Sequence, residues 1–317
     1  MNWRLLTGDV RDSLRTLPTG TARTCVTSPP YWGLRDYGVE GQLGLEPTPD
    51  AYVAAMVEVF REVRRVLAED GTLWLNLGDS YARDGGAVTK PGATAQAGNT
   101  LANVDTREQA RAVNIGLKPK DLVGIPWMLA FALRADGWYL RSDIIWHKPN
   151  PMPESVTDRP TKAHEYIFLL SKAKSYYYDA DAIAEASIHA GAVVMNNAGK
   201  NSEMGQFGQT RDGFLKPEGV TVADTRNKRS VWTIATQPYP DAHFATFPEA
   251  LIEPCILAGS AIGDTVLDPF TGSGTTGAVA IRHQRSFVGT ELNPAYVELA
   301  RQRIGKESPL FAMEGSS

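Results

Sequence analysis

A glycine-rich turn near the end of the chain constrains the fold more than any other part of the sequence. The strand-like run Val266-Leu267-Asp268 leads into Gly272, Gly274 and Gly277, spaced as Gly-x-Gly-x-x-Gly, and the helix-like run 278–281 follows. Such a strand, turn and helix let backbone amides approach a ligand without obstruction from Cβ atoms. A side chain at Gly274 should therefore block ligand binding while the protein stays folded.

An acidic residue ends the next apolar strand, residues 286–291. Glu291 could hydrogen-bond the ribose hydroxyls of a nucleoside cofactor, whether NAD or S-adenosylmethionine. Both cofactors stay open at this point, as does a surface turn without a ligand. A Walker-type phosphate loop is excluded, because no Lys follows the last glycine of the turn.

The position of the turn separates these alternatives. In an ordinary dinucleotide-binding fold the glycine turn follows the first strand, and four or more strands come after it. Here only residues 292–317 remain after Glu291. The N-terminal part of the chain must therefore complete the sheet.

Helical and extended patterns alternate through the first half of the chain. Thr48 is a plausible N-cap, Pro49 occupies the first helical position, and apolar residues then recur at three- and four-residue spacing up to Leu67. Gly71 ends that helix, and residues 72–77 read as a strand buried on both faces. A further helix and two strands are expected at about 121–135, 142–146 and 166–170. The alternation predicts βαβ units and a three-layer α/β core.

A second motif lies near the start of the chain, directly after a short apolar run. Pro29 and Pro30 lack backbone N–H groups and have restricted φ, so their carbonyls accept hydrogen bonds without competing donors. A hydroxyl precedes them at Ser28, and the rings of Tyr31 and Trp32 follow. This arrangement suits the exocyclic amine of a nucleobase, with oxygens accepting its two N–H bonds and an aromatic ring stacking on the base.

Together the two motifs resemble the beta class of amino-group DNA methyltransferases, whose motif order is permuted. In that family a Ser/Asn/Asp-Pro-Pro-Tyr motif comes first and an Asp-Pro-Phe-x-Gly-x-Gly motif last, as in residues 28–31 and 268–274 here. The resemblance covers most of the chain and implies a Rossmann-like methyltransferase fold with circularly permuted motif order. It also extends to Gly8-Asp9, Trp146 to Asn150, Arg159-Pro160, His164-Glu165 and His243 to Pro248.

The resemblance also implies roles for individual residues. Ser28, Pro29, Pro30 and Tyr31 would be catalytic, holding the amine of a base flipped out of the duplex. S-adenosylmethionine would supply the methyl group, with Asp9 near the adenine, Glu291 on the ribose and Asp268 available to the amino group. The expected contacts of the methionine portion are Phe247, Pro269, Phe270, Gly272, Ser273, Gly274, Thr275 and Thr276.

Two polar stretches are basic although the chain as a whole carries a net charge of −4. Residues 82–120 hold six Lys/Arg against three acids, and residues 186–230 hold six against four. We expect 1–185 and 231–317 to form the catalytic and cofactor-binding halves, with 82–120 as a DNA-facing insertion and 186–230 as the target-recognition region. Besides Trp32, the expected contacts with double-stranded DNA are Arg107, Arg111, Lys118, Lys120, Lys200, Arg211, Lys228 and Arg229.

The target base is cytosine N4 in the favoured interpretation, because the resembled family associates Ser at the first motif position mainly with that base. Adenine N6 is the alternative, since both amines present the same two donors. Rival functions are methylation of RNA or of a protein amide, a DNA-binding module without catalysis, and a dehydrogenase. Isothermal titration with S-adenosylmethionine and with NAD would discriminate the last two.

Composition agrees with an intracellular enzyme. The chain is 43% hydrophobic, no apolar run reaches the roughly 20 residues that span a bilayer, and the start does not read as a signal peptide, so we expect a cytoplasmic location without membrane contact. Cys25 and Cys255 lie in apolar stretches without Cys/His clustering, which predicts buried thiols and no metal site. A homodimer and a cognate restriction endonuclease stay open as partners.

Overall fold

The structure is a computed structural model of residues 1–317. It describes residues 2–34, 36, 38–82, 88–89, 117–187, 190, 193–194, 220–221, 223–237 and 247–307. The chain divides into two compact units: residues 1–179 with 230–317, and residues 180–229.

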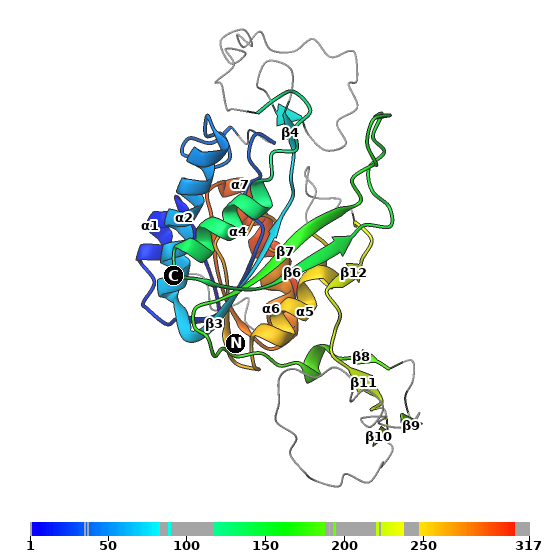
Figure 1. The fold of residues 1–317 in the computed structure, drawn as a ribbon. Helices are drawn as coiled ribbons and strands as arrows, with labels where there is room; N and C mark the ends of the chain where they lie inside the picture. The colour runs from blue at the N-terminus through cyan, green and yellow to red at the C-terminus, as the bar shows by residue number, and fades with distance from the viewer. Residues whose placement is uncertain are drawn as a thin grey trace, which may run out of the picture. The chain divides into compact units, whose positions relative to one another are not determined.

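One mixed sheet forms the centre of the larger unit (Figure 1). Its strand order is β1 (Trp3–Thr7), β14 (Ser286–Glu291), β13 (Thr265–Asp268), β2 (Ala22–Thr27), β3 (Leu67–Leu77), β7 (His164–Ser171), β6 (Tyr139–His147) and β12 (Val231–Thr233). Within this sheet β7 runs antiparallel to both of its neighbours, and the other pairs are parallel.

The motif order of the chain is visible in the strand order. The late strand β13 lies between β14 and the early strand β2, pairing Val266 with Thr24 and Leu267 with Cys25. The first strand, β1, extends the sheet beyond β14. The prediction that the N-terminal part completes the sheet is therefore confirmed.

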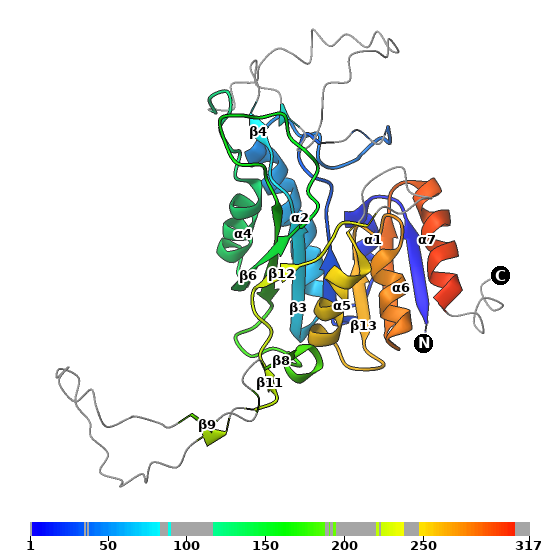
Figure 2. The same ribbon diagram turned by 90° about the vertical axis from the view of Figure 1, so that its right-hand side faces the viewer.

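Helices cover the sheet in two groups (Figures 1 and 2). One group contains α1 (Val10–Arg15), α2 (Pro49–Val66) and α4 (Ile125–Ala135), and the other contains α5 (Glu249–Gly259), α6 (Thr275–Arg282) and α7 (Pro294–Glu307). The core between the first group and the sheet includes Tyr52, Met56 and Phe60 from the apolar stripe of α2. The three-layer α/β core predicted from the sequence is confirmed.

Element boundaries differ from the predictions at two places. The helix that begins at Pro49, with Thr48 as its N-cap, ends at Val66, and β3 already starts at Leu67, so Gly71 lies inside the strand. The strands β6 and β7 pair antiparallel and are joined by residues 148–163 without a helix, so no βαβ unit forms there. The apolar run 72–77 predicts a strand buried on both faces, as in a parallel sheet; β3 is buried in this way, but it has one parallel neighbour, β2, and one antiparallel neighbour, β7.

Both cysteines are buried and free, as predicted. In the described ranges no helix is long and apolar enough to span a membrane. Short strands β4 (Tyr81–Ala82) and β5 (Val88–Thr89) pair with each other at the start of the predicted insertion 82–120. Residues 90–116 lie outside the described residues.

The smaller unit, residues 180–229, contains the 3₁₀ turn Asp181–Ile183 and two pairs of short strands. Strand β8 (Glu185–Ala186) pairs with β11 (Thr225–Arg226), and β9 (Val193–Val194) pairs with β10 (Val220–Thr221). The predicted target-recognition region, 186–230, coincides with this unit except at its two ends.

Candidate active site

The two sequence motifs meet at one edge of the sheet. Strands β2 and β13 are parallel neighbours, so Ser28 after β2 and Pro269 after β13 both leave the sheet at its carboxyl edge. In open α/β sheets this edge is where ligands bind. A hydrogen bond of 2.7 Å from Thr27 Oγ1 to Asp268 Oδ1 joins the last residues of the two strands.

Asp268 is a buried junction between the motifs. Its carboxylate accepts hydrogen bonds from Thr27 Oγ1, from Thr276 Oγ1 at 2.6 Å and from the Phe270 amide at 3.0 Å, and only 1% of the residue is exposed. Burial raises the pKa of Asp268 to about 6, against the lowering effect of these hydrogen bonds. Both carboxylate oxygens are thus engaged within the protein, and the expected contact with the cofactor amino group remains a prediction.

The three glycines of the turn have different surroundings. Gly272 has a φ of +52°, and a Cβ there would meet no described atom closer than the Phe270 carbonyl oxygen at 4.0 Å. Gly274 has a φ of +81°, and its Cβ would lie 2.9 Å from Ala300 Cα in α7. Gly277 packs so closely that a Cβ would lie 2.5 Å from Ile304 Cδ1.

These contacts correct the expectation for Gly274. A side chain there would meet α7 and not only a ligand, so a variant at Gly274 should lose stability as well as binding. Beside Gly272, by contrast, the described residues leave open space next to the turn, and this space is called the cradle below.

Two backbone amides of the turn make hydrogen bonds within the protein. The Gly272 amide donates to Glu291 Oε2 at 2.8 Å, and the Gly274 amide donates to the Thr271 carbonyl at 2.9 Å. Burial raises the pKa of Glu291, whose other oxygen accepts from the Asn293 amide. The Gly272 and Gly274 amides are thus engaged within the protein, whereas the amides that open α6 lie at a helix N-terminus, a position that suits polar groups of a ligand. The cradle beside Gly272 and the adjacent Glu291 carboxylate are compatible with a nucleoside cofactor such as S-adenosylmethionine, and the contact of Glu291 with the ribose stays a prediction.

Two other predicted cofactor residues, Asp9 and Phe247, lie just before helices. Asp9 is the N-cap of α1: it accepts from the Arg11 amide at 2.8 Å and from Arg11 Nη2 at 2.9 Å. The side-chain hydrogen bond from Arg11 lowers the pKa of Asp9. Phe247 is half-buried two residues before α5. Contacts of Asp9 and Phe247 with a cofactor stay predictions.

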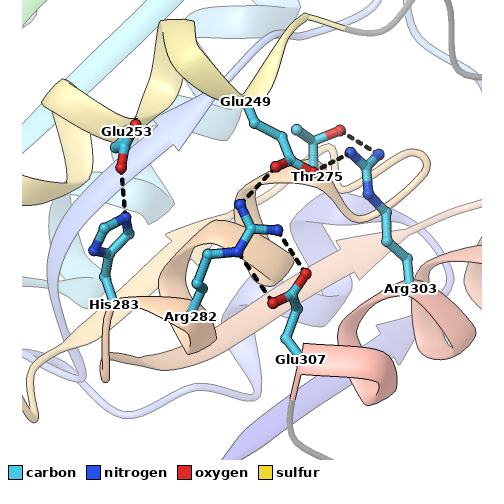
Figure 3. A network of polar contacts seen from close by, with 7 residues as sticks. All are labelled: Glu249, Glu253, Thr275, Arg282, His283, Arg303 and Glu307. Atoms are coloured by element: carbon cyan, nitrogen blue, oxygen red, sulfur yellow. Dashed lines mark hydrogen bonds and ion pairs between the residues drawn. The ribbon is translucent and has the colours of Figure 1, made fainter.

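The hydroxyls of Ser273 and Thr275 face a cationic side chain of α7. Arg303 Nη1 donates to Thr275 Oγ1 at 2.8 Å and to Ser273 Oγ at 3.2 Å, while Arg303 Nη2 pairs with Glu249 at 2.8 Å. Figure 3 shows how Glu249 also reaches Arg282, so α5, α6 and α7 are linked around the turn. Ser273 and Thr275 therefore hold the turn in place through their side chains.

The carbonyls of the Pro-Pro segment, residues 28–31, differ in whether they accept hydrogen bonds from the described residues. The Pro30 carbonyl accepts from Tyr52 Oη at 2.8 Å, and the Tyr31 carbonyl accepts from the Leu34 amide. Among the described residues no donor reaches the Pro29 carbonyl. Ser28 Oγ is the neighbouring polar atom, half-buried at the same edge of the sheet.

Tyr31 is held by residues from strands on the other side of β2. Its hydroxyl lies 2.8 Å from Glu165 Oε2 and 3.2 Å from Asn76 Oδ1, and Ser28 Oγ donates to it at 3.4 Å. Glu165 forms an ion pair with Lys148, which follows β6. Sequence reasoning placed Lys148 and Glu165 in matching segments of the family but gave them no role, and it did not single out Asn76.

The structure corrects the prediction that Trp32 contacts DNA. This residue is 5% exposed, belongs to the hydrophobic core, and donates from Nε1 to the Glu46 carbonyl at 2.7 Å. A hollow of about 10 Å³ beside it is lined by Tyr31, Gly78 and Ile125, among others, and has room for about one water molecule. The burial of its ring argues against the predicted contact of Trp32 with DNA.

The described basic residues differ in their surroundings. The side chains of Lys118 and Lys120 are 85% and 82% exposed, and Lys120 pairs with Asp158 at 2.6 Å. Lys228 and Arg229 both reach Glu185 within the smaller unit. Their DNA contacts stay predictions. The predictions for Arg107, Arg111, Lys200 and Arg211 lie outside the described residues.

Comparisons with known proteins agree with this geometry. A family model described as a DNA methylase, N6_N4_Mtase, matches residues 22–302. M.Cfr9I from Citrobacter freundii, named a type II methyltransferase, is 47% identical over 303 residues, which cover 96% of this chain and 88% of that protein. M.SmaI from Serratia marcescens, named likewise, is 47% identical over 307 residues, covering 95% and 90%.

Solved structures are similar over nearly the whole chain. The PvuII DNA methyltransferase, described as cytosine-N4-specific, matches with a TM-score of 0.64 and 18% identity, covering 100% of this chain and 89% of that one. A proposed DNA modification methylase from Thermus thermophilus, complexed with S-adenosyl-L-methionine, matches with a TM-score of 0.56 and 24% identity, covering 98% and 97%. These likenesses concern the fold and confirm the predicted methyltransferase architecture.

Proposed function

Given that this chain belongs to the N6/N4 family of DNA methylases, we propose that it is a type II methyltransferase that modifies the exocyclic N4 amine of cytosine. The observation that carries the proposal is the meeting of residues 28–31 with the glycine turn, joined by the hydrogen bond from Thr27 to Asp268. The methyl donor is S-adenosylmethionine, whose sulfonium supplies an activated methyl group. No metal ion is required by this chemistry.

The residues of the chain then have to orient the amine and hold its protons. The amine nitrogen is a poor nucleophile, because its lone pair is delocalised into the ring. Ser28 Oγ and the Pro29 carbonyl would accept its two N–H bonds and so direct the lone pair away from the ring plane. Because that nitrogen is inaccessible in a duplex, the base must be flipped out at a cost of about a few kcal/mol. The ring of Tyr31 is the aromatic surface available beside Ser28.

The preference for cytosine rests on Ser28. In the resembled family a Ser at this position accompanies mainly cytosine N4 methylation, whereas Asp or Asn accompanies mainly adenine N6 methylation. Mass analysis of nucleosides from DNA treated with the protein tests the preference directly. We expect N4-methylcytosine; N6-methyladenine as the sole product would assign the protein to the alternative.

We further propose that residues 186–230 choose the DNA sequence and that 82–120 contacts the phosphate backbone. The smaller unit, 180–229, contains β8 and β11, which are bordered by the cationic side chains of Arg226, Lys228 and Arg229 around Glu185. Base readout requires side chains that reach the grooves, whereas phosphate contacts carry no sequence information.

An exchange of residues 186–230 with those of a relative tests this assignment. The methylated sequence should change while the affinity for S-adenosylmethionine stays the same, as measured by methylation-aware sequencing and by calorimetry. An unchanged sequence would move recognition elsewhere, first to 82–120.

The type II class also predicts a partner. A cognate endonuclease that cuts the same sequence would explain the need for methylation, and DNA from cells expressing this protein should then resist that enzyme. Sedimentation of the purified protein, with and without DNA, tests the homodimer.

A further inference from the structure

We propose that Tyr31 and Glu165 form a proton relay that carries the amine proton from Ser28 toward solvent as the methyl group is transferred. The relay rests on the proposed function, because its first donor is the target amine. It assigns Tyr31 a chemical role besides stacking on the base, and it gives Glu165 a role that the motif pattern does not provide.

The relay consists of three hydrogen-bonded groups, two from the Pro-Pro segment and one from β7. Ser28 Oγ donates to Tyr31 Oη at 3.4 Å, and Tyr31 Oη donates to Glu165 Oε2 at 2.8 Å. The first distance is long for a hydroxyl pair, as hydrogen bonds of catalytic groups often are before a substrate binds. The direction of donation leaves lone pairs on Ser28 Oγ for the amine.

Tyr31 is suited to pass a proton in both directions. Burial first, and then the charge of Glu165, raise the pKa of Tyr31 well above its ordinary value, so the hydroxyl is neutral and keeps its proton to donate. Its position is fixed by Gly78, where a Cβ would lie 2.6 Å from Tyr31 Cε2 and 3.4 Å from Glu165 Cδ. A side chain at position 78 would therefore displace the ring of Tyr31, whereas Glu165 lies at an ordinary contact distance.

Glu165 is the last of the three groups and is held in place by two further donors. Asn76 Nδ2 donates to Glu165 Oε2 at 3.3 Å and to the Tyr166 carbonyl at 3.1 Å. Lys148 Nζ pairs with the other oxygen, Oε1. The Glu165 side chain is 17% exposed, so a proton that arrives there has a path to water.

Lys148 has a second partner that matters when Glu165 is protonated. Its ammonium lies over the ring of Trp146, 4.2 Å from the ring centroid. A cation–π contact of this kind stabilises an ammonium when its carboxylate partner becomes neutral. The ion pair can therefore lose its negative partner for a moment without leaving Lys148 unsupported.

Atoms and charges balance along the relay. The amine nitrogen forms a bond to the methyl carbon while the carbon–sulfur bond breaks and its electron pair stays on sulfur. The amine proton passes to Ser28 Oγ, the Ser28 proton to Tyr31 Oη, and the Tyr31 proton to Glu165 Oε2. The positive sulfonium and the negative carboxylate both become neutral, so no separated charge remains in the site.

Single-turnover methylation by two relay variants tests the proposal. Tyr31→Phe keeps the ring and removes the hydroxyl, and Glu165→Gln keeps an oxygen acceptor that cannot take up a proton. Each should slow methyl transfer by about 10²-fold, the lower range for general base catalysis, with unchanged dissociation constants for S-adenosylmethionine and DNA. Tyr166→Phe is the matched control, because it makes the same change next to Glu165 outside the relay.

Two measurements do not depend on comparing variants for activity. The wild-type rate should fall in D₂O, and its dependence on the deuterium fraction should require more than one transferred proton. In the free protein, the ¹³Cζ resonance of Tyr31, identified by its loss in Tyr31→Phe, should shift in Glu165→Gln because the hydroxyl loses its charged partner.

The outcomes separate the relay from the function on which it rests. A wild-type protein that methylates no DNA would overturn the proposed function and the relay with it. Wild-type transfer with an equally fast Tyr31→Phe or Glu165→Gln variant would overturn the relay alone. A loss in DNA affinity without a loss in rate, or a rate that is the same in D₂O, would also overturn it.

Discussion

The glycine turn and the Pro-Pro segment follow adjacent parallel strands, yet different contacts hold them. Around the turn, Asp268, Thr276 and Gly274 are buried or packed against α7, and their hydrogen bonds stay within the protein. In the Pro-Pro segment, instead, no donor among the described residues reaches the Pro29 carbonyl, and Tyr31 is hydrogen-bonded to Glu165, which is partly exposed. The difference indicates that the side chains of the turn mainly maintain the shape of the cofactor site. The side chains of the Pro-Pro segment can instead contact the substrate.

The largest effect should come from the Pro-Pro segment. Ser28→Ala removes a hydrogen bond to the amine that strengthens in the transition state, so single-turnover methyl transfer should slow by about 10²- to 10³-fold. Thermal stability and the affinity for S-adenosylmethionine should not change. Ser142→Ala on β6 is the control. A Ser28→Ala protein of full activity would leave only the Pro29 carbonyl in the mechanism.

Gly274→Val should destabilise the folded protein at the glycine turn. Its φ of +81° and the 2.9 Å approach of a Cβ to Ala300 Cα predict a loss of about 2 to 5 kcal/mol in the free energy of unfolding. Chemical denaturation measures it. Gly272→Ala is the comparison: only the left-handed backbone opposes it, at about 1–2 kcal/mol, but its methyl group enters the cradle and should weaken binding of S-adenosylmethionine. Equal stabilities of the two variants would contradict the division between the glycines.

The raised pKa of Asp268 predicts that this residue of the glycine turn makes the stability of the protein depend on pH. The folded protein holds the Asp268 proton with a pKa of about 6, against an ordinary value of 3.8, so the folded state binds this proton more tightly than the unfolded chain. Its contribution to stability is therefore full below pH 3.8 and is lost as the pH rises to about 6. The two pKa values correspond to about 3 kcal/mol.

Asp268→Asn isolates that contribution. Other carboxylates, such as Asp9 and Glu249, have lowered pKa values and act in the opposite direction, so the measurement is the difference between wild type and variant. The stability of Asp268→Asn relative to wild type should rise between pH 4 and pH 6 in denaturation experiments. A constant difference over that range would mean that Asp268 is ionised throughout.

The smallest effect should come from residues outside both regions. The double variant of Lys118→Ala and Lys120→Ala should weaken binding to all DNA sequences alike and flatten the salt dependence by about 0.9 in log–log slope for each phosphate that is no longer neutralised. Transfer rate at saturating DNA should stay the same. Lys174→Ala, an exposed lysine after β7, is the control. Loss of sequence preference in the double variant would show that 82–120 reads bases.

Much of the fold was predictable, because its strands and helices carry regular patterns. The helix from Pro49 followed from its N-cap and apolar stripe, and β14 was predicted with its observed bounds, 286–291. Where long-range pairing decided the geometry, the patterns failed. Strands β6 and β7 have the composition of buried strands in a βαβ unit, but they pair antiparallel with each other.

The sequence by itself determined the two motifs and their order, and through that order the need for an early strand to pair with a late one. Short-range chemistry is enough for this, since glycine and proline restrict the backbone wherever they stand. Only the tertiary structure decided which side chains close the site. Trp32 is in the core, Asp268 holds Thr27, and Glu165 reaches Tyr31 across 134 positions of the chain. Contacts of that kind depend on strand register and on the packing of neighbouring elements, which no local pattern encodes.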